Sequence, residues 1–153
     1  MYFMYPYYSY AEGGDTTFVV EGSTMKFGCG ALAEVGEEAL GFGMKRVAVF
    51  TDPVVARLSP VATVLQSLRA AGLDPALYDK VVVEPTDASF QAAARFAVEG
   101  RFDGFVSVGG GSVMDTCKAA NLYSTYPDDF MAYINAPLGG GKLVPGPLKP
   151  HIA

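Results

Sequence analysis

Several features that mark particular classes of protein are scarce in this sequence. Charged residues make up only 18% of the 153 positions, the formal net charge is −5, and no stripe of basic residues occurs. Because a nucleic-acid-binding surface needs such a basic stripe, we expect no nucleic-acid partner. No run approaches the ~20 apolar residues that a membrane-spanning helix requires, so we expect no membrane partner either.

Cysteine is also rare, and Cys29 and Cys117 lie far apart in the chain. One disulfide between them stays open as an alternative, although Cys117 falls in a predicted helix, where a small buried thiol is the simpler interpretation. The sparse use of cysteine favours a reducing compartment, and we expect a cytoplasmic protein. The first residues lack the basic start of a secretory signal peptide.

Half of the residues are apolar, which suffices for one domain with a sizeable core. Short apolar segments alternate with segments of helical spacing. We expect strands at 45–50, within 74–83, at 102–108 and at 148–153, and helices at 31–40, 53–71, 87–99 and 114–123, with a short helix at 129–134 and a loop at 135–147. This order predicts an α/β fold, a Rossmann-like parallel sheet flanked by helices.

Some details of these elements stay open. The strand within 74–83 is centred either on 76–78 or on 81–83. Pro60 marks either a break or a second start in the helix at 53–71, and either Asp87 or Ser89 caps the next helix.

The N-terminal part differs from the rest in composition. Residues 1–15 form an aromatic tail, and residues 16–153 form the predicted dinucleotide-binding domain, which opens with a short β-hairpin of strands at 16–20 and 24–28. Tyrosine and methionine suit both a packed segment and an interface between chains. We expect a homo-oligomer, most simply a dimer, with Met1–Tyr10 at or near the contact.

The stretch Val106–Asn121 carries the clearest motif. An apolar run leads into Gly109, Gly110 and Gly111, and Ser112 precedes a helical segment. Glycines let a backbone approach a pyrophosphate closely, and the free N–H groups of a first helical turn bind its charge. The alternative is a tight turn whose glycines serve close packing of strand and helix. The motif is not the G-x-G-x-x-G fingerprint of many dinucleotide sites.

Other polar residues follow the neighbouring strands. In parallel sheets ligands bind at the carboxyl ends of the strands, which places Asp52 and the loop Glu84–Pro85–Thr86 near the glycine turn. Asp52 either accepts hydrogen bonds from a ribose or caps the helix that follows it. Asp115, expected in the first turn of its helix, is a poor phosphate neighbour and would brace the turn.

The segment Val108–Ala119 resembles the signature of the iron-containing (group III) alcohol dehydrogenases, and 133–138 and 147–150 look like their hydroxyacid–oxoacid transhydrogenase branch. The resemblance implies that Gly109, Gly110, Gly111 and Ser112 bind the pyrophosphate of NAD(H). It implies that Asp52 faces the adenosine ribose, which favours NAD over NADP, and that Glu84, Pro85 and Thr86 border the adenosine. Asp115 would support the turn.

The chain departs from the family pattern in its histidines. Family members continue into an all-helical domain in which one aspartate and three histidines hold the metal, whereas this chain contains His151 alone. We therefore expect an NAD(H)-binding domain that lacks the C-terminal metal domain, binds neither iron nor zinc, and lacks metal-dependent oxidoreductase activity. A minimal metal-independent oxidoreductase, and a nucleotide-binding subunit that pairs with a separate catalytic chain, are the alternatives.

Overall fold

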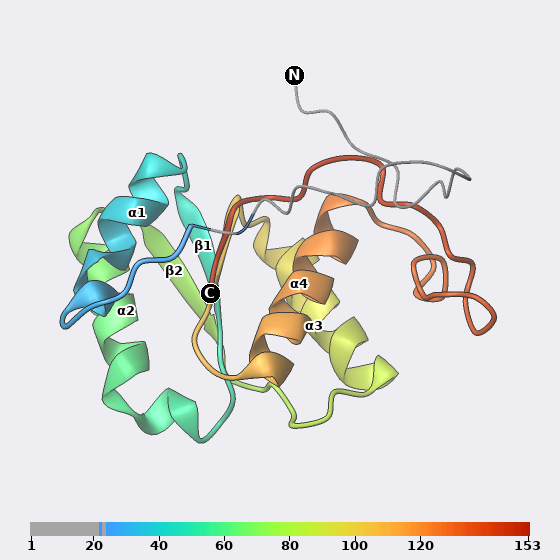
Figure 1. Ribbon diagram of the computed structural model, residues 1–153, viewed down its shortest axis with the longest axis horizontal. Coiled ribbons are helices and arrows are strands. Elements are labelled where there is room, and N and C mark those ends of the chain that lie inside the picture. The colour runs from blue at the N-terminus through green and yellow to red at the C-terminus, as the bar shows by residue number, and fades with distance from the viewer. Residues whose placement is uncertain (1–21, 23) are drawn as a thin grey trace, which may run out of the picture.

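The computed structural model describes residue 22 and residues 24–153. Its strands form one parallel sheet in the order β2-β1-β3-β4. The elements are η1 (Ala31–Glu34), α1 (Val35–Gly41), β1 (Arg46–Phe50), η2 (Val55–Arg57), α2 (Ser59–Ala70), β2 (Asp74–Tyr78), α3 (Asp87–Gly100), β3 (Gly104–Ser107), α4 (Gly111–Thr125) and β4 (His151–Ile152). Figure 1 shows α1 and α2 on one face of the sheet and α3 and α4 on the other. The predicted α/β fold is confirmed.

The side chains of β1 divide the core into two parts. Ala48 and Phe50 pack on the face that α3 and α4 cover, whereas Val47 and Val49 pack on the face of α1 and α2. Successive residues of a strand point to opposite faces, so a strand buried on both sides must be apolar throughout. That is why the run at 45–50 predicts this central strand correctly.

Two open details of the predicted elements are settled by the structure. The second strand is Asp74–Tyr78, which is the first of the two centres considered. The helix expected at 53–71 is divided at Leu58, whose extended backbone separates η2 from α2, and Pro60 lies in the first turn of α2. Proline is tolerated there because the first N–H groups of a helix have no partner within it, so Pro60 marks a second start.

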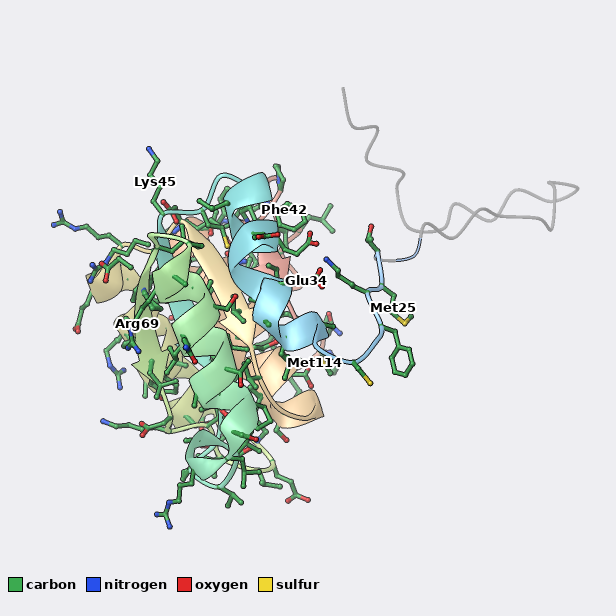
Figure 2. The ribbon with its side chains drawn as sticks, turned by 90° about the vertical axis from the view of Figure 1, so that its left-hand side faces the viewer. Met25, Glu34, Phe42, Lys45, Arg69 and Met114 are labelled. Carbon is green, nitrogen blue, oxygen red and sulfur yellow. The ribbon has the colours of Figure 1, made fainter. Side chains whose placement is uncertain are left out.

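Three local predictions are wrong. The short strand at 24–28 is absent, and its residues are exposed; Figure 2 shows Met25 pointing away from α1. The helix at 129–134 is a series of turns. Neither Asp87 nor Ser89 is the N-cap of α3; Thr86 is, and it exchanges hydrogen bonds with Ser89 in a capping box. The strand at 16–20 and the tail Met1–Tyr10, with the domain boundary at 15/16, lie outside the described residues.

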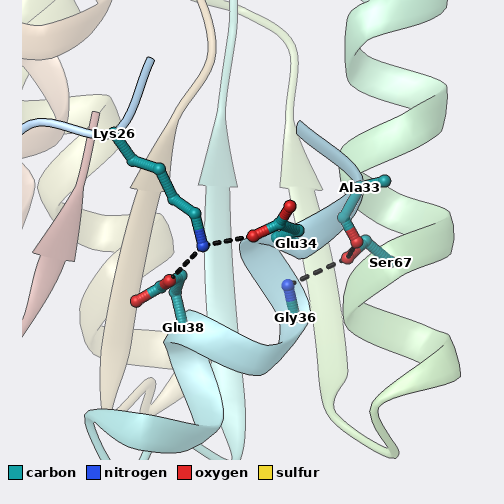
Figure 3. Close-up of polar contacts among 6 residues, drawn as sticks. All are labelled: Lys26, Ala33, Glu34, Gly36, Glu38 and Ser67. Carbon is teal, nitrogen blue, oxygen red and sulfur yellow. Dashed lines mark hydrogen bonds and ion pairs between the residues drawn. The ribbon is translucent and has the colours of Figure 1, made fainter. Parts of the chain in front are cut away.

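The helices on one face are joined by close polar contacts (Figure 3). Ser67 of α2 donates from Oγ to the Ala33 carbonyl oxygen at 2.7 Å and accepts from the Gly36 N–H at 2.9 Å. A Cβ at Gly36 would overlap the Ser67 carbonyl oxygen, so only glycine permits this helix approach. Lys26 forms exposed ion pairs with Glu34 and Glu38 and ties the preceding segment to α1.

The two cysteines are both free, Cys29 at the surface and Cys117 in the core. The disulfide alternative is therefore excluded, and the buried-thiol interpretation holds for Cys117. Burial raises the pKa of the Cys117 thiol well above its usual range because the thiolate would lose its hydration. Among the described residues, no helix combines the length and the apolarity needed to cross a bilayer.

Candidate functional site

The glycine turn joins β3 to α4 at the lower side of the view in Figure 1. Gly110 is the N-cap of α4, and its carbonyl oxygen accepts from the N–H groups of Val113 at 3.0 Å and Met114 at 3.1 Å. The N–H groups from Gly109 to Ser112 donate to no acceptor in the described part of the chain. Unpaired N–H groups at the positive end of a 15-residue helix form a site for an anion.

The three glycines of the turn differ in whether packing leaves room for a Cβ atom. A Cβ at Gly109 would lie 2.6 Å from Cγ2 of Val113, so packing of the turn against α4 excludes a larger residue there. A Cβ at Gly110 or Gly111 would meet no atom of the described structure within 4 Å, and Gly110 has an ordinary extended backbone. Close packing of strand and helix therefore explains Gly109 only. Gly110 and Gly111 leave open space over exposed N–H groups.

The carboxyl ends of β1 and β3 are held together by Thr51. The Val108 N–H donates to the Phe50 carbonyl oxygen at 2.9 Å, and Thr51 Oγ1 donates to the Val108 carbonyl oxygen at 2.8 Å. The Thr51 N–H donates to the Tyr78 carbonyl oxygen at 2.9 Å, which adds the end of β2. Asp52 and the glycine turn thus follow strand ends that are joined directly. Sequence reasoning missed Thr51, whose only signal is a hydroxyl at the end of an apolar strand.

Asp52 caps the turn that follows it. Its Oδ1 accepts from the N–H groups of Val54 at 2.8 Å and Val55 at 3.0 Å. The capping role is therefore present, on the turn that leads into η2 rather than on the long helix that was expected. Its Oδ2 accepts no hydrogen bond from the described residues and remains available to a ligand. Ribose binding by Asp52 stays a prediction.

The loop Glu84–Pro85–Thr86 lies at the start of α3. Glu84 has a φ of 57°, an uncommon conformation for a residue with a side chain, and both Glu84 and Thr86 are exposed. The Thr86 hydroxyl is engaged as the cap of α3, accepting from the Ser89 N–H at 3.3 Å. The structure thus gives Thr86 a structural role, and a contact of this loop with adenosine stays a prediction.

Asp115 does not lie where it was expected. Because α4 begins at Gly111 rather than at Met114, Asp115 falls in the second helical turn, and its side chain is exposed. In the described structure it makes no hydrogen bond to the glycine turn. Thr116 makes one instead, donating from Oγ1 to the Ser112 carbonyl oxygen at 2.7 Å. Thr116 was not predicted as a site residue.

His151 pairs with Ser107 across neighbouring strands. Its Nε2 lies 2.9 Å from Ser107 Oγ. Burial lowers the pKa of His151, and the charge of Lys118 lowers it further, so the ring is neutral at pH 7. Nowhere in the described part of the chain do three or more His, Cys, Asp or Glu side chains gather as a metal site would require. These residues do not fit an iron centre.

The glycine turn lies at the carboxyl edge of the sheet, and Gly109, Gly110 and Gly111 are exposed. Two surface hollows, of about 510 and 340 Å³, lie elsewhere, and both are lined by Arg95 of α3. Neither includes a residue of the turn. A ligand at the turn would lie across the sheet edge, over the ends of β1 and β3.

Several enzymes are similar to this chain in sequence. A hydroxyacid-oxoacid transhydrogenase, mitochondrial, of Bos taurus is 51% identical over 154 aligned positions, covering 95% of this chain and 33% of the relative. The chain thus spans about a third of the length of such relatives.

Solved structures share the fold. An alcohol dehydrogenase from Oenococcus oeni superposes with a TM-score of 0.72 at 30% identity, over 82% of this chain and 32% of that one. Sulfoacetaldehyde reductase from Bifidobacterium kashiwanohense in complex with NAD+ superposes with a TM-score of 0.75 at 21% identity, over 90% of this chain and 35% of that one. The second likeness shows the fold alone.

The expected cytoplasmic location is contradicted by these comparisons. The relative from Bos taurus, like others of 47–51% identity, carries a name that places it in mitochondria. Cysteine usage separates oxidising from reducing compartments, but it does not distinguish one reducing compartment from another. The rarity of cysteine therefore supports a reducing compartment, but it does not identify that compartment as the cytoplasm.

The family is established by a match that includes every described residue. The model of iron-containing alcohol dehydrogenases matches residues 22–153, which include the glycine turn, Asp52 and the loop at 84–86. This chain belongs to the iron-containing alcohol dehydrogenase family.

Proposed function

We propose that this chain binds NAD(H), with the pyrophosphate at the Gly109–Ser112 turn, as the cofactor-binding part of an oxidoreductase of the hydroxyacid–oxoacid transhydrogenase type. One observation carries the proposal. Gly110 and Gly111 have no packing reason to be glycine, and they leave room above unpaired N–H groups at a helix N-terminus. A ligand that approaches the backbone as closely as a pyrophosphate supplies the missing reason.

The residues around the turn would each hold one part of the dinucleotide. The N–H groups from Gly109 to Ser112 would donate to the pyrophosphate oxygens, and the dipole of α4 would favour their negative charge. The free Oδ2 of Asp52 would accept from the ribose hydroxyls, which disfavours a 2′-phosphate and hence NADP. The bound cofactor would supply the hydride, while the protein orients it.

The names of relatives agree with this proposal. The relatives of 47–51% identity are named hydroxyacid-oxoacid transhydrogenases, and one structural neighbour, the sulfoacetaldehyde reductase, was solved in complex with NAD+. Oxidation of a hydroxyacid paired with reduction of an oxoacid needs a carrier of hydride, which a nicotinamide provides.

The described residues do not fit an iron centre, so we assign them no metal-dependent step. The expectation that the chain binds neither iron nor zinc stays a prediction, as do the homo-oligomer and the loss of metal-dependent activity.

Titration with NADH tests the proposal. We expect NADH fluorescence to change on binding to the purified chain, and Gly111→Ala to weaken that binding at least tenfold, because its Cβ would occupy the space over the N–H groups. Gly41→Ala is the matched control, since Gly41 is also a helical glycine with open space at its Cβ but lies at the end of α1. Absence of binding at millimolar NADH, or equal affinity in Gly111→Ala, would contradict the proposal.

A further inference from the structure

Thr51 carries a buried hydroxyl that the proposed site has not used. Its side chain is fully buried between the ends of the central strands. A buried hydroxyl costs free energy unless it finds a hydrogen-bond partner, and a valine of similar shape would fill the same place without that requirement. The hydroxyl at this position therefore calls for an explanation beyond packing.

The partner of that hydroxyl is the last residue before the glycine turn. Thr51 Oγ1 donates to the Val108 carbonyl oxygen at 2.8 Å, and the Val108 N–H donates to the Phe50 carbonyl oxygen at 2.9 Å. Both polar backbone groups of Val108 are thus held by the end of β1. From Gly109 to Ser112 the N–H groups have no such partner in the described structure.

Because the peptide bond is planar, the hydrogen bond from Thr51 to the Val108 carbonyl also constrains the first N–H group of the turn. The Val108 carbonyl and the Gly109 N–H belong to one peptide unit, in which the C=O and N–H bonds of a trans peptide point in opposite directions. Fixing the carbonyl toward Thr51 therefore fixes the Gly109 N–H in the direction away from Thr51, and Gly109 itself is exposed. Gly109 has no side chain and is followed by two more glycines, so the backbone itself does little to fix this orientation.

We propose that Thr51 is a positioning residue, which aims the Gly109 N–H at the pyrophosphate of the bound dinucleotide. This inference rests on the proposed NAD(H) binding and names a residue outside the turn on which that binding depends. Thr51 also directly precedes Asp52. The end of β1 therefore positions both the Gly109 N–H assigned to the pyrophosphate and the carboxylate assigned to the ribose. The distance between the two parts of the site is thereby fixed by the backbone of β1.

Substitutions that separate the hydroxyl from the shape of the side chain test the proposal. Thr51→Val removes the hydrogen bond and keeps the branching, whereas Thr51→Ser keeps the hydroxyl. We expect Thr51→Val to weaken NADH and ADP about fivefold, the effect of one neutral hydrogen bond, and Thr51→Ser to bind close to wild type. Adenosine, which lacks the pyrophosphate, should bind wild type and Thr51→Val equally well in an NMR titration.

Several results would overturn the proposal. Equal NADH affinity in wild type and Thr51→Val, an equal loss for adenosine and NADH, or a loss in Thr51→Ser as large as in Thr51→Val would each exclude positioning through the hydroxyl. Thr51→Ala is a second hydroxyl-free variant for the case in which Thr51→Val does not fold. If the wild type bound neither NADH nor ADP, the proposed function would fail with it. A change in none of the variants, with wild-type binding intact, removes the Thr51 proposal alone.

Discussion

The parallel sheet has an amino edge, where its strands begin, and a carboxyl edge, where they end, and the two are stabilised in different ways. At the amino edge, side chains satisfy the backbone: Asp103 Oδ1 accepts from the N–H groups of Lys45 at 2.9 Å and Arg46 at 3.0 Å. Arg46 in turn pairs with Asp74, donates from Nε to the Gly100 carbonyl oxygen at 2.8 Å, and lies over the Phe102 ring. At the carboxyl edge, the turn after β3 leaves its N–H groups from Gly109 to Ser112 unpaired.

The same contrast holds for the glycines. At the amino edge a Cβ on Gly104 would overlap the buried side chain of Met44, so the fold itself requires glycine. At the carboxyl edge the fold tolerates a Cβ on Gly110 and Gly111. Packing thus explains the glycine at 104, whereas the open space and the unpaired N–H groups at Gly110 and Gly111 are what the proposed ligand would need. The difference separates the edge whose glycine the fold requires from the edge at which we propose that the cofactor binds.

The largest expected effect comes from placing one methyl group at each edge. Gly104→Ala should lower the free energy of unfolding by about 1–3 kcal/mol, because the Cβ overpacks the core against Met44. Gly111→Ala should leave stability unchanged or raise it by up to about 1 kcal/mol, since alanine is the better helix former. Urea denaturation of both variants measures the difference. Equal destabilisation by the two substitutions would contradict the division between the edges.

A smaller effect is expected at two carboxylates that occupy matching positions. Asp103 and Asp52 each accept two backbone N–H groups through Oδ1, at opposite edges. Replacing either by alanine should cost about 1 kcal/mol of stability, the usual value of a lost cap. Asp52→Asn keeps the acceptor and removes the charge, so stability should be retained.

Asp52→Asn then decides between the two roles of that residue. If Asp52 faces the ribose, the variant should lose affinity for NADH and gain relative affinity for NADPH, because the carboxylate no longer repels the 2′-phosphate. The matched Asp103→Asn should change neither. Unchanged NADH and NADPH affinities in Asp52→Asn would leave capping as the only role of Asp52.

The core of this fold follows from sequence because its signals are local and strong. The apolar strand at 45–50 and the glycines that end α1 and α2 act through sterics and burial, which single residues reveal. The strand at 24–28 was wrong because a weak local pattern does not decide structure where the side chains are exposed. The helix at 129–134 was wrong because its carbonyl groups accept from the loop that follows, as the Met131 carbonyl oxygen does from the Gly140 N–H at 2.8 Å. In the loop 126–148, tyrosine hydroxyls fix the backbone instead, as Tyr133 does by donating to the Tyr126 carbonyl oxygen at 3.0 Å.

The sequence predicted the residues proposed to contact the ligand better than the residues that hold them in place. The glycine turn and Asp52 stand out because their residue types are unusual at strand ends. Thr51 and Thr116 could not be found, since their roles depend on which carbonyl lies within reach of a hydroxyl after folding. Asp115 was placed one turn too early because the glycines Gly110 and Gly111 concealed where α4 begins.

The smallest expected effect is a pH dependence near the carboxyl edge, where His151 contacts Ser107. Burial lowers the pKa of His151 below its usual value of about 6.5, with a further contribution from Lys118, so the unfolded chain takes up this proton first as the pH falls. The stability contributed by the neutral ring is fully present above pH ~6.5 and declines below it, until the folded form is protonated as well.

Replacing His151 by a side chain that does not titrate isolates this contribution. His151→Gln keeps a polar group near Ser107 Oγ and should show a smaller loss of unfolding free energy between pH 8 and pH 5.5 than the wild type does. Urea denaturation at the two pH values measures both losses, and carboxylates that titrate in this range affect both proteins alike. If the two losses were equal, the neutral His151 ring would contribute nothing to stability in this pH range.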